Sequence, residues 1–156
     1  MIKYTKEELN KILEDHQLWL NDNTTGKRAD LSGANLIDTD LSYADLRGAD
    51  LSGAYLIDAN LKFADLRGAT LISANLMDAV LMDADLTCTD LRGATLISTF
   101  LSDSKLLCAN LKGANLKGAD LENADLYQTN LEYANLADVD LTLVDLTNAI
   151  FRKESI

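Results

Sequence analysis

Residues 29–53 read ADLSGANLIDTDLSYADLRGADLSG, a stretch in which a leucine recurs at every fifth position. The spacing continues from Leu31 to Leu146 and ends at Phe151, which gives 25 consecutive pentads without an insertion. The residue two before each leucine is always small: it is alanine in 18 pentads, and threonine, serine or valine in the other seven. Repetition this strict indicates a solenoid in which one short unit is stacked many times.

A period of five fits neither an α-helix nor a straight β-strand. At about 100° per residue, leucines five apart would spread over every side of a helix. In a strand, residues five apart would point to opposite faces, whereas the small residue and the leucine, two apart, share one face. Each pentad is therefore expected to be a short extended piece followed by a corner. The small residue and the leucine would turn inward, and the other three positions outward.

Two further positions indicate how the corners are made. The residue before each leucine is aspartate 11 times and asparagine seven times. Both side chains can accept a hydrogen bond from a nearby backbone N–H, so we interpret most of them as turn residues rather than as functional groups. Seven of the eight glycines stand two after a leucine, where a corner with positive φ favours glycine.

Pentads such as ADLSG, ANLID, ADLRG, ANLKG and ADLEN resemble those of the pentapeptide-repeat family, over residues 29 to about 153. The resemblance implies an all-β solenoid, namely a right-handed quadrilateral β-helix with four pentads to a coil. The 25 pentads would then form about six coils, and at about 4.8 Å per coil the rod would be roughly 30 Å long. Residues 20 apart would stack in columns, and like residues do recur at this interval: Ile37, Ile57, Met77 and Ile97 in one column, Cys88 and Cys108 in another.

The residues before the repeat are typical of a capping helix. Thr5-Lys6-Glu7-Glu8 is a capping-box pattern followed by apolar residues at helical spacing, which predicts a helix from about Lys6 to Leu20. Its apolar face is expected to cover the first coil, whose end would otherwise expose leucines and unpaired backbone groups. We thus divide the chain into a cap helix and linker (residues 1–28), the repeat (29–153) and a C-terminal tail (154–156).

The C-terminal end of the repeat is expected to be poorly covered. Residues 151–156, FRKESI, are too short for the C-terminal dimerising helix that the gyrase-inhibiting members of the resembled family carry. An open edge offers pairing to a second copy, which leads to the hypothesis of an end-to-end homodimer through the C-terminal coil.

Composition restricts the partners. The chain has 25 acidic and 14 basic residues, and its net charge of −11 opposes direct binding to nucleic acid or to an anionic membrane surface. The N-terminal residues lack the apolar core of a signal peptide, and the sequence contains no stretch of about 20 apolar residues. We therefore expect a soluble, cytoplasmic protein whose partner is basic or apolar.

The residue types that carry chemistry form no recognisable site. His16, the only histidine, falls in the predicted cap helix and is interpreted as an interface residue. Cys88 and Cys108 match neither a disulfide framework nor a metal motif, and the many aspartates have no evident pocket. Phosphate-loop, zinc and Ser-His-Asp patterns are missing. We expect no catalytic residue, no metal and no cofactor, and hence a protein that is not an enzyme.

One group of outward-facing residues is more apolar than the coil requires. We call it the apolar wall; it consists of Ile37, Ile57, Met77, Ile97, Tyr43, Tyr55, Phe63, Val80, Met82 and Phe100. An exposed apolar patch often marks a partner site, although side chains lying flat against the coils would leave the same pattern.

Two functions compete on these grounds. The first is a non-catalytic scaffold that binds an unidentified protein partner, through the apolar wall. The alternative follows from the resemblance, because some family members are acidic rods that mimic DNA and inhibit DNA gyrase, and a net charge of −11 is compatible with that role. The short rod, the missing dimerising helix and the missing loop insertions stand against the alternative.

Overall fold

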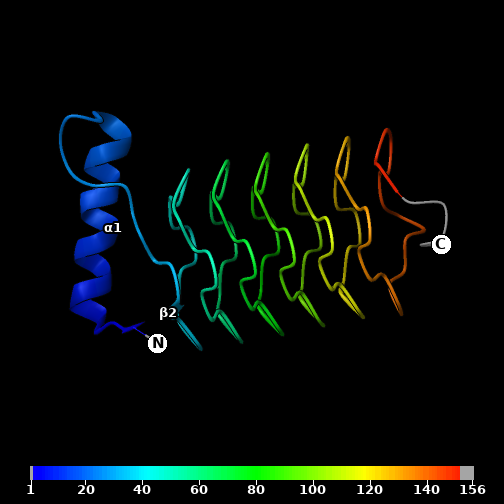
Figure 1. The fold of residues 1–156 in the computed structure, drawn as a ribbon, viewed down its shortest axis with the longest axis horizontal. Coiled ribbons are helices and arrows are strands. Elements are labelled where there is room, and N and C mark those ends of the chain that lie inside the picture. The colour runs from blue at the N-terminus through cyan, green and yellow to red at the C-terminus, as the bar shows by residue number, and fades with distance from the viewer. Residues whose placement is uncertain (1, 152–156) are drawn as a thin grey trace.

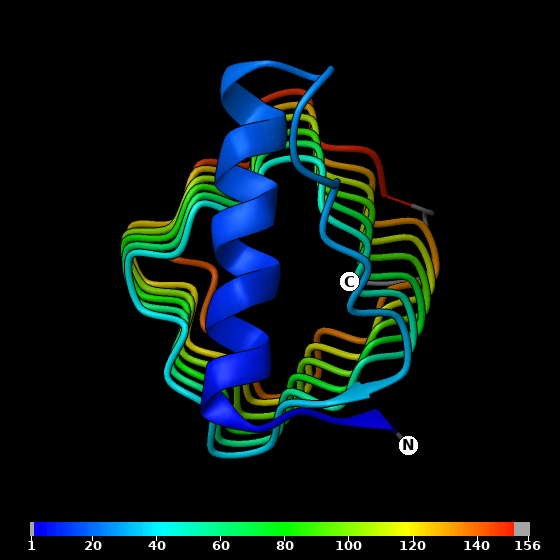
Figure 2. The ribbon, with the colours of Figure 1, turned by 90° about the vertical axis from the view of Figure 1, so that its left-hand side faces the viewer.

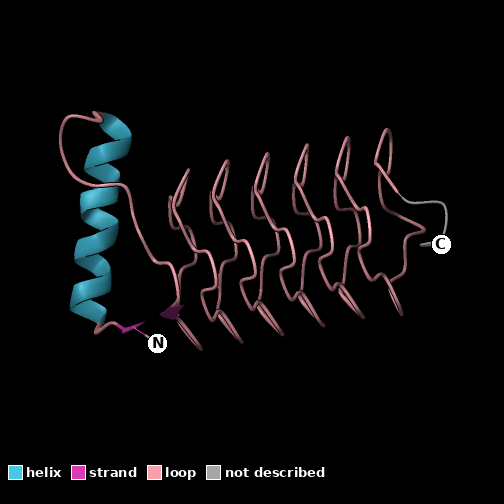
Figure 3. Ribbon diagram, viewed as in Figure 1, coloured by secondary structure: helices cyan, strands magenta, loops and turns pink. Residues whose placement is uncertain are grey.

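The computed structural model describes residues 2–151 and shows a rod of stacked coils with one helix across its N-terminal end (Figure 1, Figure 3). Residues 20 apart pair in parallel along most of the rod, as Asp30 does with Asp50 and Asp85 with Lys105. Leucine N–H groups donate to the carbonyl 19 residues later, and the bond from Leu31 to Asp50 is 2.7 Å long. The predicted right-handed quadrilateral β-helix with four pentads to a coil is thereby confirmed.

Except at Leu143, the corners are tight turns whose third residue has a positive φ, as a type II turn requires. In the first of them the Ala34 N–H donates to the Leu31 carbonyl at 3.1 Å, and Gly33 has a φ of 61°. Every aspartate and asparagine that precedes a leucine accepts the backbone N–H of the residue two further on, as Asp30 does from Ser32 at 3.1 Å. The predicted role of these side chains in turns is confirmed.

Leucines and small residues fill the inside of the rod. The repeat leucines from Leu31 to Leu131 are at most 2% exposed. At three of the four threonines in the small position, the hydroxyl reaches a backbone carbonyl of the preceding coil: Thr99 Oγ1, for example, donates to the Leu76 carbonyl at 2.8 Å. The buried hydroxyl is therefore satisfied, and the polar substitution is tolerated in an apolar interior.

Four faces run along the rod, and we number them by their leucines. Face 1 begins with Leu31, face 2 with Leu36, face 3 with Leu41 and face 4 with Leu46, and each continues at every twentieth residue. The two residues after a leucine form a corner, so residues 57–58 lie on the corner before face 3 and residues 62–63 on the corner after it. Because the coils stack in register, equivalent residues form columns parallel to the rod axis, as the sequence predicts.

Helix α1 (Lys6–Asn21) lies across the end of the rod and is one residue longer than predicted (Figure 2). Its capping box is complete: the Glu8 N–H donates to Thr5 Oγ1 at 3.2 Å, and the Thr5 N–H donates to Glu8 Oε2 at 2.8 Å. The apolar face of α1 packs on the core through Leu9, Ile12 and Leu13. The helix therefore covers the first coil, which is the lid expected from the sequence.

Three further contacts attach this lid. Strand β1 (Ile2–Lys3) pairs in parallel with β2 (Ala34–Asn35) and so adds a backbone ladder before the first coil. His16 is fully buried, and its Nδ1 accepts the Ala29 N–H at 3.0 Å. Gly26 has a φ of 67°, and a Cβ there would lie 2.1 Å from the Asp15 carbonyl oxygen. Only glycine fits this position, because a side chain would clash with the backbone of α1.

The last coil is open within the part of the chain that the structure describes. Its leucines Leu136, Leu141 and Leu146 are only half-buried, in contrast to those of the preceding coils. The small position holds Val139 and Val144 in this coil, and valine lacks the hydroxyl with which the threonines reach the preceding coil. The exposure of the last coil, residues 136–151, agrees with the predicted poor cover of this end. The proposed C-terminal tail, residues 154–156, lies outside the described residues.

Candidate functional site

The ten residues of the apolar wall gather around face 3. Val80 and Phe100 pair in adjacent coils on the face itself, and Phe100 is 45% exposed. The corners on either side hold the rest, except for Tyr55, which lies on face 2: Ile37, Ile57, Met77 and Ile97 before face 3, and Tyr43, Phe63 and Met82 after it. The wall combines flat and projecting side chains. Ile57, Met77 and Ile97 are half-buried against the coils, whereas the aromatic side chains project into solvent.

The aromatic residues of the wall adopt a strained backbone conformation. Tyr43 and Phe63 each have a φ of 59°, in the left-handed region that bulky side chains rarely occupy. Their rings stack on adjacent coils with centroids 4.9 Å apart, and Tyr43 is 73% exposed. Glycine would satisfy the backbone at this corner at lower energy, as it does elsewhere in the chain. The coil itself therefore does not require these two aromatic residues.

Carboxylates border the wall. On the corner before face 3, Asp58 and Asp78 follow Ile57 and Met77, and they are exposed. On the corner after face 3, Asp83 and Asp103 continue the column that begins with Tyr43 and Phe63. None of these four aspartates forms an ion pair within residues 2–151.

Asp45 and Asp65, which precede leucines on face 4, differ from these four aspartates because they pair with arginines. Asp45 and Asp65 accept bonds from Arg47 and Arg67, and the Arg47 Nη2–Asp45 Oδ2 distance is 2.6 Å. The Arg47 side chain holds the pKa of Asp45 below its ordinary value. These carboxylates also accept the corner N–H groups, so their role is in the turns.

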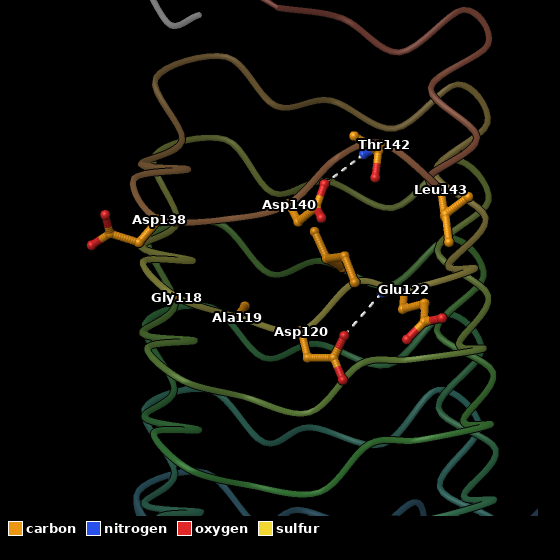
Figure 4. A pocket seen from close by; sticks show the side chains of 9 residues that line it. Gly118, Ala119, Asp120, Glu122, Asp138, Asp140, Thr142 and Leu143 are labelled. Carbon is orange, nitrogen blue, oxygen red and sulfur yellow. Dashed lines mark hydrogen bonds between the residues drawn. The ribbon is translucent and has the colours of Figure 1, made fainter.

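A cavity of about 430 Å³ opens between the last two coils (Figure 4). In the described residues no bridge joins Asp120 to Asp140, although the pairing is intact on both sides of this gap. Asp138, Asp140 and Glu122 lie around the opening, and their side chains point in different directions. The pentad spacing does not predict this cavity, because it continues through residues 120–140 without interruption.

The histidine and the two cysteines do not come together in the structure. His16 is buried under the cap, and burial lowers its pKa, an effect that the carboxylate of Asp45 partly opposes. Cys88 and Cys108 are free thiols on adjacent coils, and desolvation, with the neighbouring thiol, raises the pKa of Cys108. Within residues 2–151, no group of three or more His, Cys, Asp or Glu side chains could hold a metal ion. Among the same residues, no helix has the length and apolar character needed to cross a membrane.

Two of the solved structures similar to this chain come from a cyanobacterium and a plant. One is HetL, a pentapeptide repeat protein involved in heterocyst differentiation regulation in the cyanobacterium Nostoc, with 36% identity and a TM-score of 0.66. The match covers 80% of this chain and 66% of HetL, so the chain spans just under two thirds of that protein. A pentapeptide repeat protein from the thylakoid lumen of Arabidopsis thaliana is 29% identical, with a TM-score of 0.51 and 70% of each chain covered.

The plasmid-mediated fluoroquinolone resistance protein QnrB1 is a more distant neighbour. It is 18% identical with a TM-score of 0.42, and the match covers 81% of this chain and 86% of QnrB1. At this distance the comparison carries no functional argument. No characterised protein with a curated description matches the sequence.

The family assignment follows from the sequence profile. The profile described as pentapeptide repeats matches in eight copies over residues 29–62, 59–103, 84–123, 99–132 and 109–148. These matches cover most of the chain and coincide with the coils of the structure. The chain belongs to the pentapeptide-repeat family, as the resemblance of its pentads implies.

Proposed function

We propose that this chain is a non-catalytic scaffold that binds a protein partner through the apolar wall on face 3. The observation that carries the proposal is the pair Tyr43 and Phe63, which expose stacked aromatic rings from left-handed backbone positions. A left-handed conformation costs a bulky residue roughly 1–2 kcal/mol, which the stacking of two rings, worth about 0.5–1.5 kcal/mol, offsets only in part. Contact with a partner would account for residues that the fold alone disfavours.

The rest of the surface supports a binding role rather than a catalytic one. The described carboxylates before the leucines are used in corners, and His16 is used to attach the cap. A rigid rod with backbone ladders along its length presents a preorganised surface, so a partner would lose little binding energy to ordering it. The proposal includes an intracellular setting, in which Cys88 and Cys108 stay reduced.

Affinity capture from a lysate of the source organism tests this proposal. The native chain is compared with the double variant Ile57→Lys, Met77→Lys, and retained proteins are identified by mass spectrometry. The matched control is Ile72→Lys, Leu107→Lys, which adds the same charge at half-buried apolar positions outside face 3. A protein that is retained by the native chain and the control but lost with the face-3 variant is the expected result. Equal retention by all three chains contradicts a role for the wall.

The same experiment distinguishes the second candidate, a DNA mimic that binds a topoisomerase. The net charge of −11 is the feature that favours it. A topoisomerase retained at low salt, released at moderate salt and indifferent to the wall variant would replace the scaffold proposal with this one, because a DNA-binding surface would recognise charge rather than apolar side chains.

A further inference from the structure

Aspartates occupy selected corners of the rod. Within residues 2–151, aspartate takes the left-handed corner position only on the two corners that border face 3; these residues are Asp38, Asp58, Asp78 and Asp138 before it, and Asp83 and Asp103 after it. On the other two corners the same position is held by glycine, serine, cysteine, amide side chains or tyrosine. The carboxylates at this position therefore line one face of a four-sided rod.

The fold does not require carboxylates there. Glycine adopts a positive φ without steric penalty, and aspartate tolerates it less well. Gly48 and Gly68 show that glycine serves the equivalent position on the corner before face 1, with φ of 67° and 64°. Nor do these aspartates make the corner bond, since none of them accepts a corner N–H among residues 2–151. On the corners of Asp38, Asp78 and Asp138, the asparagine before the leucine accepts it instead.

Among residues 2–151, no lysine or arginine forms an ion pair with the five corner aspartates between Asp38 and Asp103. Arg47, Arg67 and Arg92 pair with aspartates on faces 4 and 1. Lys62, on the corner after face 3, lies over the Phe63 ring with its Nζ 4.8 Å from the centroid. Asp138, farther along the rod, is paired with Lys117 at 3.7 Å. The unpaired carboxylates thus coincide with the coils that carry the apolar wall, residues 37–103.

The dimensions of this surface suit a single α-helix. Two successive corners are five residues apart, so the acidic borders are at most about 16 Å from each other. An α-helix with its side chains is about 10–12 Å wide. The four coils that carry the wall extend about 15 Å along the rod, which corresponds to about ten residues, or three turns, of helix.

We propose that face 3 binds a cationic amphipathic α-helix of about three turns, whose apolar stripe contacts the wall and whose Lys or Arg side chains reach the aspartates on both borders. This inference rests on the proposed function and names the chemistry of its partner. Unpaired carboxylates beside an apolar strip disfavour nucleic acid and anionic lipid, and favour a peptide that combines apolar and basic residues.

The test measures binding of two fluorescein-labelled helical peptides of about 14 residues by fluorescence anisotropy. In the first, leucines form one stripe with lysines on both sides; in the second, glutamates replace the lysines. The protein variant Asp78→Asn, Asp83→Asn removes one charge from each border. The matched control, Asp85→Asn, Asp125→Asn, removes the same charge from face 4 and keeps the oxygen that accepts the corner N–H. Urea unfolding checks that both variants are folded.

We expect the native chain to bind the lysine peptide and not the glutamate peptide. The border variant should weaken binding about fivefold at 0.05 M salt, roughly the effect of two exposed charge pairs, and the control less than about twofold. At about 0.3 M salt this difference should shrink, because screening acts on exposed charges. Equal affinity of the border variant and the control, or binding of the glutamate peptide, overturns the inference.

A third variant, Val80→Ser, Phe100→Ser, separates this inference from the proposed function. If it weakens binding of the lysine peptide while the border variant does not, the wall binds helices without charge recognition: the proposed function stands and the inference fails. If neither variant changes the affinity, face 3 is not the binding surface and both fail.

Discussion

Replacement of Leu86 by alanine tests how tightly the interior of the rod is packed. Leu86 is fully buried, with Leu66 and Leu106 in the same column on the coils to either side. The change removes three carbon groups, which at about 0.8 kcal/mol each gives about 2.4 kcal/mol of lost transfer free energy. The cavity adds to this, because the backbone ladders on both sides limit collapse, so we expect a total loss of about 3–4 kcal/mol in the free energy of unfolding.

The matched control is Leu146→Ala, the same substitution on the same face in the last coil. Leu146 is only half-buried, so its truncation should cost no more than about 1–2 kcal/mol. Urea unfolding followed by circular dichroism gives both values by linear extrapolation. Ala84→Phe, which overpacks the coil of Leu86, should be destabilising by about 1–3 kcal/mol. Equal losses for Leu86 and Leu146, or no shift with Ala84→Phe, would refute the packed interior.

Three further predictions concern the cap and the borders. Gly26→Ala should release α1 from the first coil, because its Cβ would lie 2.1 Å from the Asp15 carbonyl oxygen; amide hydrogen exchange in α1 should rise while the central coils keep their protection. The folded-state pKa of His16 is lowered, so its neutral form contributes stability in full above about pH 6.5, and this contribution is lost as the pH falls through the folded pKa. Fluorescence of Trp19, stacked on His16 at 5.5 Å, should report the loss, and His16→Asn should remove the pH dependence. Asp83→Gly should raise the free energy of unfolding, measured with urea, by about 0.5 kcal/mol. The same variant should bind the lysine peptide about twofold more weakly, as measured by fluorescence anisotropy.

The sequence was most informative where one physical requirement acts on many residues. The inward leucines, the glycines with positive φ and the carboxylates that accept corner N–H groups each recur in register, so one pentad predicts all the others. The cap helix was predictable because Thr5 and Glu8 form a local pattern that needs no tertiary information. Only its attachment was missed: the clash at Gly26 and the His16–Ala29 bond depend on how the linker folds back on α1.

The candidate site was harder to predict because the repeat determines most residue types. The 20-residue interval places the wall residues in columns, but it does not predict how far each side chain projects into solvent. Ile57 and Phe63, for example, differ in their exposure. The opening between Asp120 and Asp140 had no signal in the pentad spacing. The aspartates bordering face 3 stand two residues after a leucine in the sequence, but their lack of ion pairs depends on where the arginine and lysine side chains reach in the structure.

Site-specific photocrosslinking shows whether a partner binds through face 3. Benzoylphenylalanine replaces Phe100 on face 3 in one chain and Thr70 on the opposite face 1 in another. Each chain is irradiated in a lysate of the source organism, and crosslinked products are identified by mass spectrometry. We expect a discrete partner that is crosslinked through position 100 and absent from position 70. A partner captured only through position 70, or equally through both, would contradict binding through face 3.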